Sequence, residues 1–66
     1  MANVEGTTII VNSEVLTAGQ LEEKRQKVKK WQDDGYCKMA IVYFLKKEVN
    51  SLSLTFKENR FIINIG

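Results

Sequence analysis

The segment from residue 52 to residue 65 constrains the fold of this 66-residue chain more than any other feature. Residues 52–57 (LSLTFK) and residues 60–65 (RFIINI) are strand-like runs with apolar side chains at every second position, and only Glu58 and Asn59 separate them. Alternation is typical of strands, and a two-residue connection is the shortest common link between antiparallel strands. The spacing predicts three apolar cross-strand pairs on one face: Leu52 with Ile65, Leu54 with Ile63, and Phe56 with Phe61.

A strand and a helix are predicted before this hairpin. Residues 7–11 (TTIIV) are β-branched at every position, which favours a strand. Thr17 and Gln20 have the spacing of a capping box, in which each side chain accepts a hydrogen bond from the other residue's backbone. Apolar side chains then recur at helical spacing, so we expect an amphipathic helix over residues 18–34 that is ended by Gly35.

The segment over residues 36–46 has an apolar side chain at nearly every position. With a period of two, Met39 and Ile41 would lie on one face, and Ala40, Val42 and Phe44 on the other. A strand that is apolar on both faces is typical of the middle of a sheet. The segment is therefore predicted to be a central strand.

These elements together predict an α+β fold, β-α-β-β-β, in a single small domain over residues 1–66, with a frayed N-terminus at residues 1–6. One helix would pack on one face of a mostly antiparallel four-stranded sheet. The first strand would run parallel to the strand over residues 36–46, because a helix connects them. The last strand, residues 60–65, would lie at an edge where it could accept a strand from a partner.

A single helix can cover only one face of such a sheet. Ala40, Val42, Phe44 and Ile62 would then form an apolar strip on the other face, and monomers rarely expose a large one. Cys37 is the only cysteine, so no internal disulfide can stabilise so short a chain. We therefore expect this strip to bind a second copy of the chain or another protein. The alternative is that the N-terminal segment or a loop folds over it.

The expected helix carries a run of basic residues that predicts a second function. Phosphate contacts with nucleic acid would be made by Lys24, Arg25, Lys27, Lys29 and Lys30. Acidic residues bracket the run, however, and a solvated helix surface, which explains it without any function, is the favoured interpretation. No recognised nucleic-acid-binding motif accompanies it.

Enzymatic chemistry is not expected. The chain has no histidine, which is the base that commonly activates a catalytic thiol such as that of Cys37. The sequence also has no set of side chains with the spacing of a zinc or calcium site. We expect no metal and no cofactor. No run of apolar residues is long enough to span a bilayer, and the N-terminus lacks the features of a signal peptide. The sequence therefore predicts a cytoplasmic, non-enzymatic, homodimeric protein-interaction module that regulates or inhibits a protein partner.

Overall fold

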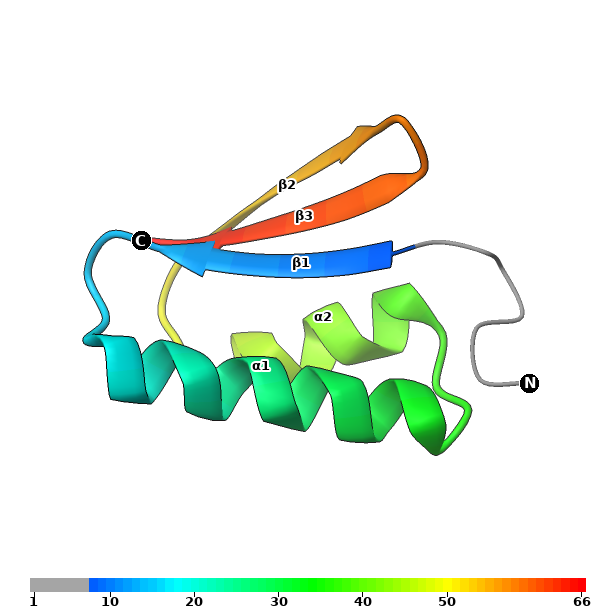
Figure 1. Ribbon diagram of the computed structural model, residues 1–66, viewed down its shortest axis with the longest axis horizontal. Helices are drawn as coiled ribbons and strands as arrows, with labels where there is room; N and C mark the ends of the chain where they lie inside the picture. The colour runs from blue at the N-terminus through cyan, green and yellow to red at the C-terminus, as the bar shows by residue number, and fades with distance from the viewer. Residues whose placement is uncertain (1–7) are drawn as a thin grey trace.

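Two helices lie against one face of a three-stranded sheet in the computed structural model, which describes residues 8–66 (Figure 1). The elements follow in the order β1 (Thr8–Ser13), α1 (Ala18–Asp33), α2 (Lys38–Lys46), β2 (Leu52–Lys57) and β3 (Arg60–Ile65). The fraying predicted for residues 1–6 falls outside the described residues.

The last strand, β3, is the centre of the sheet, whose order is β1-β3-β2. It runs parallel to β1 and antiparallel to β2. The predicted hairpin register is confirmed, with the pairs Leu52 and Ile65, Leu54 and Ile63, and Phe56 and Phe61. The predicted two-residue turn is also present, and both of its residues are left-handed, Glu58 at a φ of 53° and Asn59 at a φ of 63°. Such turns match the twist of the adjoining strands.

The prediction of a strand over residues 36–46 is wrong, because Lys38–Lys46 form the helix α2. A short run that is apolar at almost every position fits a buried strand and a buried helix equally well. Gly35, at a φ of 97°, ends α1 in a left-handed conformation, and α2 follows almost at once. The predicted four-stranded, mostly antiparallel sheet with one helix is therefore replaced by a mixed three-stranded sheet with two helices, in the order β-α-α-β-β.

The second helix changes which side chains form the core. The buried apolar residues lie between the sheet and the helices and are Val11, Val28, Ile41, Val42, Leu45, Phe61, Ile63 and Ile65. Three of them come from α2, at the helical spacing of 41, 42 and 45. Three more come from one face of the central strand β3. The apolar run of residues 38–46 is thus buried by a helix rather than by a sheet.

The start of α1 is held by the predicted capping box. The backbone N–H of Gln20 donates to Thr17 Oγ1 at 3.2 Å, and the backbone N–H of Thr17 donates to Gln20 Oε1 at 3.1 Å. The helix continues to Asp33, one residue short of the predicted end. Its contacts with β1 bring the side chain of Arg25 to the backbone of that strand.

Candidate functional site

The four residues of the predicted apolar strip do not share a surface. Ala40, Val42 and Phe44 lie on α2 and Ile62 lies on β3. Val42 is in the core and only 5% exposed, because the helical period turns it toward the sheet. The ring centroid of Phe44 lies 5.1 Å from the ring centroids of both Trp31 and Tyr36. The strip was derived from a strand with two apolar faces, and that strand does not exist.

A different apolar surface is exposed, on the edge strand β2. By the register of the hairpin, Leu54 and Phe56 lie on the same face of the sheet as Ile63 and Phe61. The two residues on β3 are 0% and 6% exposed, whereas Leu54 is 43% and Phe56 58% exposed. Figure 1 shows the reason, since the β2–β3 hairpin rises away from the helices toward its turn. The helices cover the inner face of β3 but leave that of β2 largely open.

The backbone of β2 is open along the same strand. The backbone N–H of Gly66 donates to the carbonyl of Ser51 at 3.1 Å, which makes these two residues a hydrogen-bonded pair. Pairs in an antiparallel ladder alternate, so Ser53, Thr55 and Lys57 direct their N–H and C=O groups toward β3. The N–H and C=O groups of Leu52, Leu54 and Phe56 then point away from β3, and β2 has no neighbour on that side among the described strands.

The opposite edge of the sheet, β1, is partly closed by α1. The N–H of Thr8 donates to the carbonyl of Asn59 at 3.2 Å, so in the parallel ladder Val11 directs its backbone groups away from β3. The guanidinium of Arg25 donates from Nε to the carbonyl of Val11 at 2.9 Å and from Nη2 to Asn12 Oδ1 at 3.3 Å. An arginine on a strand edge hinders the approach of another strand. The edge of β2 is therefore the more accessible one.

Sequence reasoning placed the free edge on the wrong strand. Residues 60–65 were expected at the edge, but they form the central strand β3, and residues 52–57 form the edge strand β2. The signal that distinguishes them is present in the sequence. Residues 60–65 carry Ile62 between two other apolar residues, so both faces are partly apolar, whereas the alternate positions of residues 52–57 are serine, threonine and lysine. A polar alternate face is typical of a strand that is solvated on one side.

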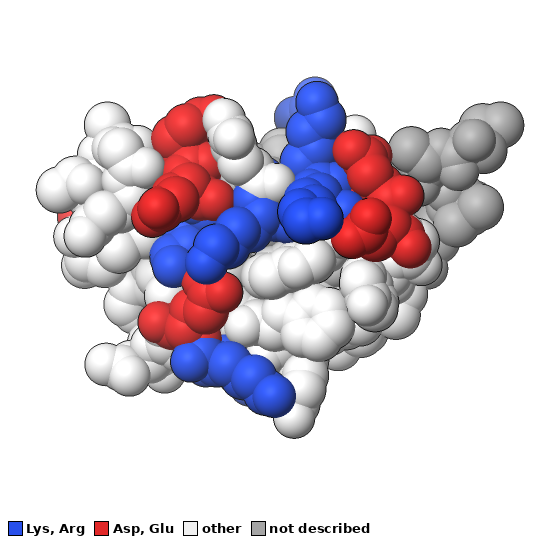
Figure 2. All heavy atoms as spheres, turned by 90° about the horizontal axis from the view of Figure 1, so that it is seen from below, with Lys and Arg blue, Asp and Glu red and all other residues white. Residues whose placement is uncertain are grey.

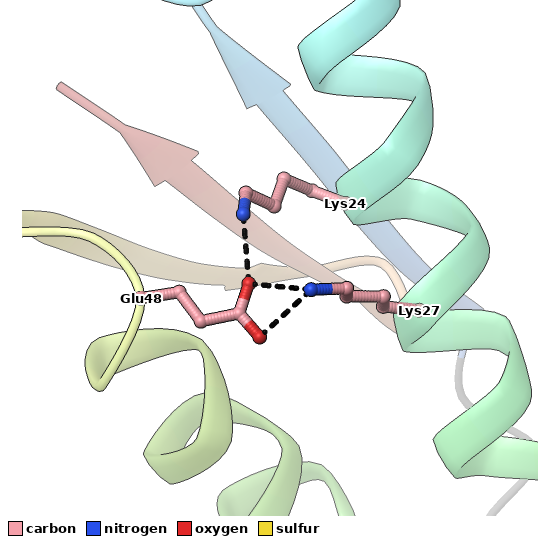
Figure 3. A network of polar contacts seen from close by, with 3 residues as sticks. All are labelled: Lys24, Lys27 and Glu48. Atoms are coloured by element: carbon pink, nitrogen blue, oxygen red, sulfur yellow. Dashed lines mark hydrogen bonds and ion pairs between the residues drawn. The ribbon is translucent and has the colours of Figure 1, made fainter.

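Most of the predicted nucleic-acid contacts are engaged within the chain. Lys24 Nζ lies 2.7 Å from Glu48 Oε1, and Lys27 Nζ lies 3.1 Å from Glu48 Oε2 (Figure 3). Lys30 Nζ lies 3.6 Å from Asp34 Oδ2. Arg25 donates hydrogen bonds to Val11 and Asn12 of β1 as described above, which leaves Lys29 as the member of the predicted set with neither an ion pair nor a side-chain hydrogen bond to a described residue.

The charges on this side of the molecule are also mixed. Figure 2 shows lysine and arginine side chains interleaved with acidic ones rather than gathered in one basic patch. A phosphate backbone is bound by a continuous run of positive charge. The arrangement therefore does not favour the nucleic-acid interpretation.

Glu48 lies just after α2 and forms ion pairs with Lys24 and Lys27 of α1. These ion pairs change the pKa of its carboxyl group. The hydrogen bond from Lys24 is the main cause that holds the pKa of Glu48 below its ordinary value of 4.5, with Lys27 acting in the same direction and partial burial opposing both. A carboxyl group whose pKa is depressed by folding stabilises the folded state in its ionised form. That stabilisation is complete above about pH 4.5 and is lost as the pH falls through the lower, folded-state pKa.

Glu48→Gln is therefore expected to lower the free energy of unfolding by about 0.2–1 kcal/mol at neutral pH, the usual range for a partly exposed ion pair. The difference from the unmodified protein should shrink as the pH falls below 4.5 and vanish once it has passed the lower folded-state pKa of Glu48, because the glutamate in the folded chain is then neutral as well. Urea unfolding followed by circular dichroism at a series of pH values measures this. Glu14→Gln is the control, since Glu14 is exposed and makes no ion pair with a described residue. A difference that stays constant with pH would contradict the assignment.

The described residues form no cluster of metal-binding side chains. Among residues 8–66, no group of three or more histidine, cysteine, aspartate or glutamate side chains gathers where a metal ion could be held. Cys37 is exposed and is the N-cap residue of α2. Within the same range, no helix is long and apolar enough to cross a bilayer.

Comparison with protein-family models, curated proteins and solved structures finds no match. The edge of β2 is the candidate functional site, because open backbone groups and exposed apolar side chains occur on the same strand there.

Proposed function

We propose that this chain is a non-enzymatic protein-interaction module that binds an extended segment of another polypeptide along β2. The observation that carries the proposal is the coincidence of two features on one strand. The outward N–H and C=O groups of Leu54 and Phe56 offer ladder hydrogen bonds, and their side chains offer apolar surface. In strand addition, backbone hydrogen bonds supply much of the affinity and alternate side chains supply the specificity.

Among the described residues, β2 has no proline, bulge or charge between Leu52 and Phe56 that would prevent such pairing. Edge strands are commonly protected by proline, by a bulge, by very short length or by a charge pointing inward. The chain contains no proline, and β2 pairs with β3 without interruption over six residues. Its one charged residue, Lys57, lies at the end of the strand beside the turn. An incoming strand therefore meets no charge between Leu52 and Phe56.

The two faces of β2 define the partner. The inner face presents Leu54 and Phe56, and the outer face presents Ser53 and Thr55. A matching segment would be extended, with apolar side chains at alternate positions on the helix side and polar side chains between them. A folded surface or a helix would leave the outward backbone groups of β2 unpaired.

Selection of peptides from a displayed library of random heptapeptides tests the proposal. We expect the bound peptides to alternate apolar and polar residues and to shift the backbone NMR signals of Leu52, Leu54 and Phe56. Leu54→Lys should weaken their binding by about tenfold or more, because it places a charge on the inner face. Thr55→Lys is the matched control, since the same charge one residue along projects from the outer face into solvent. Peptides that perturb α1 instead, or that bind Leu54→Lys unchanged, would contradict it.

A further inference from the structure

We propose that the strand bound by β2 is β2 of a second copy of this chain, paired antiparallel about a two-fold axis that passes at Thr55. This inference rests on the proposed function of the β2 edge and names its partner. The two sheets would join into one of six strands, in the order β1-β3-β2-β2-β3-β1, with the helices of both copies on the same side. The neighbouring chain would complete the edge that is open in Figure 1.

Symmetry restricts the register of such a pair. A two-fold axis perpendicular to the sheet preserves its faces, so residues opposite each other must lie on the same face. The two-fold axis must therefore pass between two copies of the same residue, and it cannot pass at a peptide bond between two residues. The axis can pass at Leu54 or at Thr55, because only these two positions pair at least five residues of β2 in each copy.

The exposed side chains favour the centre at Thr55. In that register Leu54 of each copy faces Phe56 of the other, so the two open apolar residues of β2 cover each other twice. Both residues have outward backbone groups, and they would form hydrogen-bonded pairs. A centre at Leu54 would instead place Phe56 opposite Leu52, which already packs against the core of its own chain. An axis at Thr55 thus buries the two apolar side chains that a single copy leaves exposed, Leu54 and Phe56.

The charges of β2 are compatible with self-pairing. Residues 52–56 are uncharged, so no like charges meet along the apolar part of the interface. In the Thr55 register Lys57 of one copy faces Ser53 of the other. The two lysines are then offset by four residues, about 14 Å at the rise of an antiparallel strand. A chain of this size also belongs to the class that commonly gains stability from oligomerisation.

Sedimentation equilibrium of the full chain measures the association. Concentrations from about 1 µM to about 1 mM suit the affinity of a small interface. We expect a dimer whose dissociation constant rises about tenfold or more in Leu54→Lys and also in Thr55→Lys, since the latter would bring two ammonium groups together at the axis. Thr8→Lys, an exposed position on β1, should leave association unchanged. Ser53→Glu should tighten the dimer and Ser53→Lys should weaken it, because each faces Lys57 of the other copy.

Cross-linking tests the register directly. In a Cys37→Ser background, Thr55→Cys would bring the two introduced thiols to a non-hydrogen-bonded pair with a Cα separation of about 4.5 Å, within the range of a disulfide. We expect rapid formation of a covalent dimer under mild oxidation. Ser53→Cys is the matched control, because its two thiols would be about 14 Å apart. Faster cross-linking by Leu54→Cys than by Thr55→Cys would overturn the proposed register.

The outcomes separate this inference from the proposed function. A chain that remains monomeric to about 1 mM, with Thr55→Cys no faster than Ser53→Cys, overturns the dimer. If that monomer still binds the selected peptides at β2, the proposed function survives without it. A dimer that persists unchanged in Leu54→Lys overturns the inference as well, because its interface then lies elsewhere.

Discussion

Ile41→Ala is expected to lower the free energy of unfolding by about 2–4 kcal/mol, one of the two largest effects expected for a single substitution in this chain. Ile41 is fully buried on α2, and its truncation removes apolar contacts and leaves a cavity between the helices and the sheet. A domain of this length has a total stability of only about 3–10 kcal/mol. Urea unfolding followed by circular dichroism measures the loss, and Ile41→Val, expected to cost about 1 kcal/mol, keeps the measurement possible if the alanine variant does not fold.

The matched control for Ile41→Ala is Met39→Ala. In a strand, residues 39 and 41 would share one face, and both substitutions would be costly. In the helix α2 they point in different directions, and Met39 is 59% exposed. We therefore expect Met39→Ala to change the free energy of unfolding by about 0.5 kcal/mol or less. Equal costs at the two positions would contradict the helix.

Ile63→Ala is expected to have an effect of similar size, a loss of about 2–4 kcal/mol. Ile63 is fully buried on the central strand, where it lies between Val11 of β1 and Leu54 of β2. The adjacent Ile62 projects from the face that carries no described helix and is partly exposed. Ile62→Ala should therefore cost clearly less in the same urea experiment. A cost at Ile62 as large as at Ile63 would show that the outer face is covered.

The two proposals for β2 have a joint consequence. One edge can pair with only one strand at a time, so self-association and the binding of another polypeptide would exclude each other. A partner segment would have to compete with the second copy, and its apparent affinity would fall as the chain concentration rises. Peptide titrations at two chain concentrations therefore report on both equilibria.

Local features of the fold were predictable from the sequence. The hairpin register followed from alternation in residues 52–65 and from the two residues between the strands, and the structure has the same pairs. The capping box of Thr17 and Gln20 was equally local, since its two hydrogen bonds join residues three apart. Gly35 ended the first helix near the predicted position. In each case the determining interactions lie within a few residues of one another.

The candidate site was only partly predictable. The sequence indicated an open strand edge and an exposed apolar surface, but it assigned them to residues 60–65 and to the strip of Ala40, Val42, Phe44 and Ile62. Both assignments depended on a strand over residues 36–46. Once that segment is a helix, Val42 belongs to the core, and the open surface moves to Leu54 and Phe56.

The sequence by itself determined the hairpin, the first helix and the polar outer face of β2, because backbone geometry and close neighbours set these features. Only the tertiary structure decided that residues 38–46 form a helix, that β1 pairs with β3, and that Arg25 reaches the backbone of β1. An apolar run such as residues 38–46 can bury its side chains as either element. The choice depends on which distant surfaces are available to cover it, and that free energy is absent from the local pattern.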